Sequence, residues 1–177
     1  MSKLFYVLAL ASAVMFTPAQ QTAVPNFAGT WSLDKSKSQG LSAAYRSFEQ
    51  SVWQITQTEN EISIHETFFD FAVKNLPPAR SATGGGNEPI GPATYKLDGS
   101  ETTKNIGRSK YLRKAVLSKD GKTLELVERI ISQGTDGEVA STRTDTLSLS
   151  ADGKVLTVFR RKEDSPGPKE STLVFNQ

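Results

Sequence analysis

The stretch NFAGTWSLD, residues 26–34, is the part of this sequence that says most about the fold. Within it, Gly29 and Trp31 open the first segment that alternates apolar and polar residues, the pattern of a β-strand with one buried face. A tryptophan at this position is large enough to fill the base of a small core. We therefore expect the domain to begin with a strand, and Trp31 to be a packing residue rather than a ligand-binding one.

A removable leader precedes this stretch. Lys3 is followed by an apolar run of 13 residues, 4–16, which is typical of a signal peptide and too short to span a membrane. Thr17-Pro18-Ala19 then provides the small residues of a cleavage site after Ala19. The sequence thus predicts a signal peptide over 1–19 and one secreted or periplasmic domain over 20–177.

Composition narrows the possible functions. The chain contains no Cys and only one His, His65, which is too few for a typical zinc or copper site, so no cofactor or metal is expected. A net charge of +2 at pH 7 gives no reason to expect nucleic-acid binding. No second long apolar run follows the leader, so no membrane span is expected. The oligomeric state stays open.

Alternation with a period of two dominates the rest of the chain, and Asp-Gly turns at 120–121 and 152–153 separate the strands. Only residues 41–48 have the pattern of a short helix. Such a chain favours an all-β fold, an antiparallel up-and-down β-barrel of about 8–9 strands with one short helix after the first strand. The expected strands are 29–34, 50–58, 61–69, 93–97, 110–118, 123–132, 139–150, 155–162 and 172–175.

The turns also predict which residues face each other, because a slip of one residue would exchange the two faces of a strand. A two-residue turn at 152–153 places Leu149 opposite Leu156. The same turn at 120–121 places Arg113 opposite Glu128 on an otherwise apolar face. Both choices sort the apolar residues onto one face.

A tight turn at Glu59-Asn60 places Trp53 opposite Glu66, on the face that also carries Phe68. A carboxylate on an apolar face is costly unless it is paired or wetted. Either these groups line a ligand cavity, or the register differs by one residue, or they form satisfied ion pairs near the barrel rim. On the first hypothesis, Glu66→Leu keeps the fold. The ligand-binding candidates are then Trp53, Glu66, Phe68, Arg113 and Glu128.

Two further segments stand out. Residues 75–92 hold four prolines and four glycines, which is typical of a long loop, either a lid or a tolerated insertion. Basic residues gather in 104–114 and again at Arg160-Arg161-Lys162. We expect these basic residues to solvate outward strand faces, as such clusters usually do.

Three pieces of the chain, FAGTWSLDKS at 27–36, YKLDG at 95–99 and LSLSADGKVLTV at 147–158, resemble the exported bacterial lipocalin-like (calycin-type) β-barrel proteins. The resemblance implies an up-and-down barrel with an internal cavity and implies no enzymatic activity. Lipocalins also pack an arginine from a late strand over the first tryptophan. The resemblance therefore implies that Arg160 or Arg161 covers Trp31.

The interpretation that these observations favour is an exported binding protein that holds a small apolar or amphiphilic molecule in a barrel cavity. Two alternatives remain open. One is a protein-binding barrel, for example an inhibitor of a secreted hydrolase, that acts through the 75–92 loop. The other is a barrel enzyme that uses paired carboxylates, for which Glu66 and Glu128 are the candidates.

Overall fold

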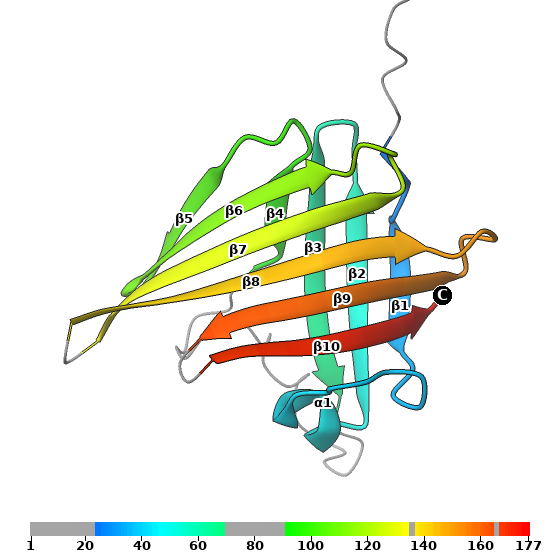
Figure 1. Cartoon of the computed structure of the whole chain (residues 1–177), viewed down its shortest axis with the longest axis horizontal. Coiled ribbons are helices and arrows are strands. Elements are labelled where there is room, and N and C mark those ends of the chain that lie inside the picture. The colour runs from blue at the N-terminus through cyan, green and yellow to red at the C-terminus, as the bar shows by residue number, and fades with distance from the viewer. Residues whose placement is uncertain (1–23, 70–90, 135–136, 165–166) are drawn as a thin grey trace, which may run out of the picture.

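Ten antiparallel strands and one short helix make up the computed structural model of the chain, which describes residues 24–69, 91–134, 137–164 and 167–177 (Figure 1). In chain order the elements are β1 (Gly29–Leu33), α1 (Ala43–Ser47), β2 (Gln50–Gln57), β3 (Glu61–Phe69), β4 (Ala93–Lys96), β5 (Thr102–Ile106), β6 (Ser109–Leu117), β7 (Thr123–Gly134), β8 (Gly137–Leu149), β9 (Val155–Asp164) and β10 (Gly167–Asn176).

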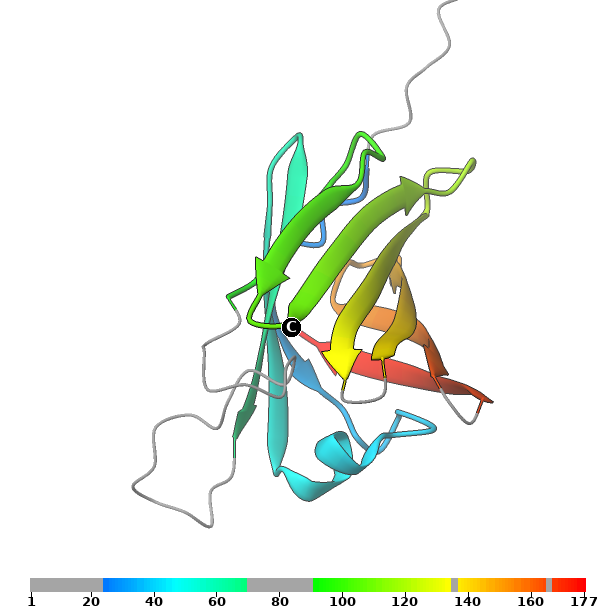
Figure 2. The ribbon, with the colours of Figure 1, turned by 90° about the vertical axis from the view of Figure 1, so that its left-hand side faces the viewer.

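The strands form one sheet in the order β4-β3-β2-β1-β10-β9-β8-β7-β6-β5. The first and last strands of the chain pair with each other in the middle of the sheet. The sheet curls round, and β5–β8 face β2 and β3 across the interior (Figure 2). The barrel is nearly closed, because β4 and β5 are the two edges of the sheet. A hydrogen bond from Thr102 Oγ1 to the carbonyl of Thr94, 3.4 Å long, links the two edges.

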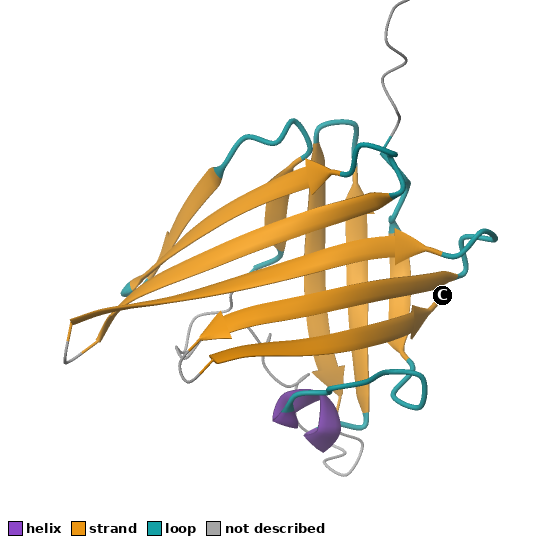
Figure 3. Ribbon diagram, viewed as in Figure 1, coloured by secondary structure: helices purple, strands orange, loops and turns teal. Residues whose placement is uncertain are grey.

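The all-β, up-and-down fold confirms the main prediction from the sequence, but the number of strands is ten rather than 8–9. The missed strand is β5, whose sequence TTKNI has almost no apolar alternation to mark it. The helix is shorter than expected, and β10 begins at Gly167, before the apolar residues from which a strand at 172–175 was predicted (Figure 3).

Two loops with the same side-chain pattern set the register of the hairpins. In the loop at 150–154, Ser150 Oγ donates to Asp152 Oδ1, the N–H of Lys154 donates to the same oxygen, and Gly153 has a left-handed φ of +71°. The loop at 118–122 repeats these bonds with Ser118, Asp120 and Lys122. The predicted pairs are confirmed: Leu149 faces Leu156, Arg113 faces Glu128, and Trp53 faces Glu66.

One end of the barrel interior is apolar and closely packed. Trp31 is 1% exposed, and its indole N–H donates to the carbonyl of Phe27 over 2.9 Å. Trp53 packs on Phe175 with ring centroids 4.8 Å apart. Phe27, Ile55 and Ile62 add to this core from the first part of the chain. Strands β7 to β10 contribute Leu124, Leu147, Leu156, Val158 and Leu173, which alternate with outward polar residues.

Several predictions cannot be compared with this fold. The predicted signal peptide over 1–19 lies outside the described residues, as does most of the 75–92 loop, of which only Gly91 and Pro92 are described. Within the described ranges, no helix is long and apolar enough to cross a membrane.

The packing of Trp31 gives the first prediction. Trp31→Ala should lower the free energy of unfolding by about 3–5 kcal/mol, because it opens a large void in the apolar end of the core. Thr30→Ala is the matched control. Thr30 is the exposed neighbour of Trp31, so this substitution should change the free energy of unfolding by no more than about 0.5 kcal/mol. Urea unfolding followed by circular dichroism measures both, and equal effects would show that Trp31 is not a core residue.

Candidate functional site

A band of buried and half-buried charged side chains crosses the barrel next to the apolar core. Arg113 Nε lies 2.6 Å from Glu128 Oε2, and Glu128 Oε1 lies 3.1 Å from Arg143 Nη2. Arg143 Nε is 3.3 Å from Asp145 Oδ2, and Arg160 binds both oxygens of Asp145 at 2.6 and 2.9 Å. The band therefore joins four strands, β6 to β9, through a continuous series of ion pairs.

Strand register explains why these residues meet. Arg113, Glu128 and Arg143 are direct neighbours across β6, β7 and β8, while Asp145 is opposite Arg160 across β8 and β9. Side chains at such positions lie about 4.5–5.5 Å apart at Cβ, and opposite charges there attract. Because Asp145 is two residues from Arg143, both point inward.

Glu66 is the centre of a second buried cluster. Its Oε1 accepts hydrogen bonds from Tyr45 Oη at 2.7 Å, Trp53 Nε1 at 2.8 Å and Ser51 Oγ at 3.2 Å. Arg160 Nη1 in turn donates to Tyr45 Oη over 2.7 Å. The phenol thus connects Glu66 to the charged band and ties α1 to the interior of the barrel.

Burial and neighbouring charges set the protonation states in these clusters. Burial by itself would raise the pKa of Asp145, but Arg160 and Arg143 outweigh it and hold that pKa below its ordinary value of 3.8. Burial raises the pKa of Tyr45 far above its ordinary value and that of Tyr95 to about 12. At neutral pH the carboxylate of Asp145 is therefore ionised and both phenols keep their protons.

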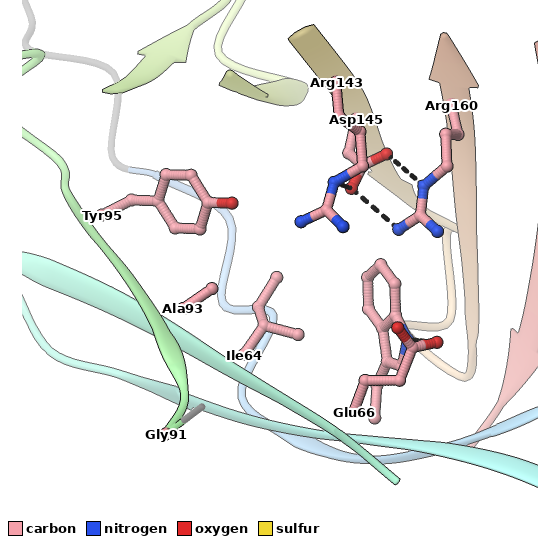
Figure 4. A pocket seen from close by; sticks show the side chains of 9 residues that line it. Ile64, Glu66, Gly91, Ala93, Tyr95, Arg143, Asp145 and Arg160 are labelled. Atoms are coloured by element: carbon pink, nitrogen blue, oxygen red, sulfur yellow. Dashed lines mark hydrogen bonds and ion pairs between the residues drawn. The ribbon is translucent and has the colours of Figure 1, made fainter. Parts of the chain in front are cut away.

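A small cavity lies between the two clusters, with a volume of about 20 Å³. Figure 4 shows Arg143, Asp145 and Arg160 reaching into it from one wall, while Tyr95, Ala93, Ile64 and Glu66 lie on the facing wall. Trp53 and Gly91 complete its lining. The cavity is therefore apolar on part of its surface and strongly polar on the rest.

The polar groups around this cavity differ in how far their hydrogen-bonding capacity is used. Arg160 is committed to Asp145 and Tyr45 and stacks over the ring of Trp53, 5.5 Å from its centroid. All the hydrogen bonds that described residues donate to Glu66 arrive at Oε1, which leaves Oε2 available. Arg143 contacts its two carboxylates only as ion pairs, at 3.1 and 3.3 Å.

All five residues predicted as ligand-binding face the interior and are buried. Trp53 and Glu66 line the cavity, whereas Phe68, Arg113 and Glu128 lie outside its lining. Phe68 instead packs against Tyr45 and Phe48. The proposed ligand-binding role of the five stays a prediction.

Sequence reasoning missed Tyr95, Arg143, Asp145 and Arg160. A signal was present: Arg143 and Asp145 alternate in phase with the buried Leu147, and Arg160 with Val158. The expectation that Arg160 solvates an outward face is wrong, because its side chain faces the interior, is only 12% exposed and pairs with Asp145. Its cation–π contacts within the described structure are to Trp53 and Tyr45, not to Trp31 as the resemblance implied.

The paired-carboxylate hypothesis receives no support from this arrangement. Glu66 lines the cavity but Glu128 does not, and Glu128 is held between Arg113 and Arg143. The second carboxylate at the cavity, Asp145, is kept ionised by its arginines and so cannot serve as a general acid. Among the described residues, no group of three His, Cys, Asp or Glu side chains could hold a metal ion.

No protein-family model matches the chain, and no curated protein matches its sequence. Among solved structures, it is similar to a zebrafish ileal bile acid-binding protein complexed with cholic acid. That similarity has 11% sequence identity and a TM-score of 0.47, and it covers 85% of this chain and 98% of the other.

The hydrogen bonds of Glu66 overturn the expectation that Glu66→Leu is harmless. The substitution leaves three buried donors without an acceptor, each at a cost of about 1–3 kcal/mol. We therefore expect Glu66→Leu to lower the free energy of unfolding by at least about 3 kcal/mol.

Glu66→Gln is the matched control, because its amide oxygen can still accept at the Oε1 position and the loss should stay near 1–2 kcal/mol. Urea unfolding at pH 7 compares the two variants. A Glu66→Leu protein as stable as Glu66→Gln would show that the three bonds to Oε1 contribute nothing to the fold.

Proposed function

We propose that this protein is an exported, lipocalin-like barrel that binds a small amphiphilic molecule in its interior. The observation that supports this most is the cavity itself, where apolar side chains and polar groups with unused hydrogen-bonding capacity meet. Ligand sites are typically apolar pockets with a few polar groups that orient the ligand. The export and the bacterial origin rest on the sequence features of residues 1–19 and on the resemblance.

The two sides of the cavity suggest how such a ligand would lie. Trp53, Ile64 and Ala93 offer an apolar surface on β2, β3 and β4. Arg143 offers N–H donors from β8, on the facing wall, and Glu66 Oε2 offers an acceptor. An amphiphile can satisfy both sides at once, whereas a purely apolar molecule would leave the polar groups desolvated and unpaired.

The cavity is too small to hold an amphiphile as it stands. About 20 Å³ is enough for one water molecule, whereas pockets for drug-sized ligands measure about 300–1,000 Å³. Binding therefore requires part of the wall to move. The best candidate is β4, which is four residues long, pairs only with β3 and carries Ala93 and Tyr95 of the cavity lining.

The protein-binding alternative has less support in the described structure. Its predicted contact segment, 75–92, lies almost entirely outside the described residues. The exposed large apolar residues that are described, Val116, Val139 and Phe159, lie on three different strands, and none pairs with another. Isolated apolar residues of this kind are common on monomer surfaces and do not indicate an interface.

The experiment is binding of the uncharged fluorophore N-phenyl-1-naphthylamine, with tryptophan excitation, so that energy transfer reports a probe close to Trp53. Ala93→Leu adds apolar volume inside the cavity and should weaken binding at least about tenfold, equivalent to roughly 1.4 kcal/mol. Gln54→Leu, which places the same leucine side chain on the outer face of β2, is the control and should leave binding unchanged.

Thermal unfolding of both variants separates a blocked cavity from a damaged fold. Failure of the native protein to bind the probe would refute the proposed function. Undiminished binding by a stable Ala93→Leu protein would place the binding site elsewhere.

A further inference from the structure

The inner face of the sheet carries a row of like charges toward the end where β9 turns into β10. Arg143 on β8 is directly opposite Lys162 on β9, and Lys162 is directly opposite Lys169 on β10. Lys162 alternates in phase with the buried Val158 and with Arg160, so the row continues the interior face. Like charges in directly opposite positions destabilise a sheet.

The acidic groups nearby do not balance this row. Asp164 Oδ2 lies 2.9 Å from Lys162 Nζ, while its Oδ1 lies 3.8 Å from Lys169 Nζ, so one carboxylate serves two ammonium groups. In the buried band, Glu128 and Asp145 are shared among three guanidinium groups. The lysine cluster therefore has one positive charge in excess, whereas Glu66, which reaches Arg160 through Tyr45, balances the third arginine of the band.

A further cation, Lys104, lies near the cavity on the edge strand β5. Lys104 on β5 has its Nζ 3.8 Å from the position that a Cβ on Gly91 would take, and Gly91 lines the cavity. Buried Arg113, in the charged band, also has a donor, Nη2, for which the described residues provide no acceptor. The remaining acid at the cavity, Glu66, accepts three hydrogen bonds at Oε1 and offers only Oε2, on the wall that faces Arg143.

We propose that the polar end of the ligand is an anion, a carboxylate, sulfonate or phosphate, that sits beside Arg143 with Lys104 and Lys162 around it. The inference rests on the proposed function and narrows its ligand to an anionic amphiphile. An anion there would separate the like charges of Arg143 and Lys162 and would accept hydrogen bonds from guanidinium N–H groups that have no well-directed partner. A cationic head would meet the positive charge of Lys104 and Lys162 and bind more weakly.

Two fluorophores with the same aromatic rings test this. N-phenyl-1-naphthylamine is uncharged, and 1-anilinonaphthalene-8-sulfonate adds one sulfonate to it. The native protein should bind the sulfonate at least about fivefold more tightly, and added sodium chloride should weaken only the sulfonate.

The double variant Lys104→Gln/Lys162→Gln changes exposed side chains and should leave the fold intact. It should weaken the affinity for the sulfonate about fivefold to tenfold and change the affinity for the uncharged probe by no more than about twofold. The control is Lys119→Gln/Lys154→Gln, which removes the same charge from the two Asp-Gly loops at the other end of the strands. It should leave both probes within about twofold.

A competition experiment identifies what the site accepts. Dodecanoate below its micelle concentration should displace the bound sulfonate, dodecanol should need at least about a fivefold higher concentration, and acetate and inorganic phosphate should not displace it. If acetate or phosphate displaces the sulfonate as well as dodecanoate does, the site binds free anions, and the proposal of an amphiphilic ligand is refuted.

The failures of the two proposals are distinguishable. Binding of the uncharged probe with no preference for the sulfonate overturns the anionic head and leaves the proposed function standing. Equal loss of sulfonate binding in the two lysine double variants shows a general charge effect and also overturns it. Binding of neither probe overturns both proposals.

Discussion

The contact on which the rest of the interior depends is the bidentate ion pair between Arg160 and Asp145. A guanidinium can be buried in a barrel only if acceptors surround it, and Arg160 finds them in Asp145 and in the hydroxyl of Tyr45. That hydroxyl then donates to Glu66, which orders Trp53 and Ser51. One side chain thereby links β9 to β8, α1, β3 and β2.

Buried ion pairs of this kind add little to stability, because the cost of desolvating the charges offsets most of their attraction. Stability comes instead from the apolar end of the barrel, where Trp31, Leu147, Leu156 and Phe175 are almost fully buried. The division between an apolar end and a charged band is more easily understood if the charged band serves a ligand, since a barrel of this size could fill its interior with apolar side chains alone.

The backbone hydrogen bonding of the barrel is interrupted between the two edge strands, β4 and β5. Eight of the strands pair on both sides, whereas β4 and β5 each pair on one side. Ala93 and Tyr95 from β4 and Lys104 from β5 approach the cavity from these two edges. A site next to the seam can change its volume with the loss of few backbone hydrogen bonds, while the apolar end and the pairing of β1 with β10 hold the rest of the barrel in place.

The sequence by itself determined the strand registers, because the period of two and the Ser-x-Asp-Gly-Lys loops allow only one arrangement that sorts the apolar residues. Those registers already paired Arg113 with Glu128 and Trp53 with Glu66. The strand β5 was not predictable from its polar sequence, since its position comes from pairing with β6. Only the tertiary structure decided that Arg160 meets Tyr45, 115 residues away along the chain, because that contact forms only when β1 pairs with β10 and the curled sheet brings α1 against the inner face of β9.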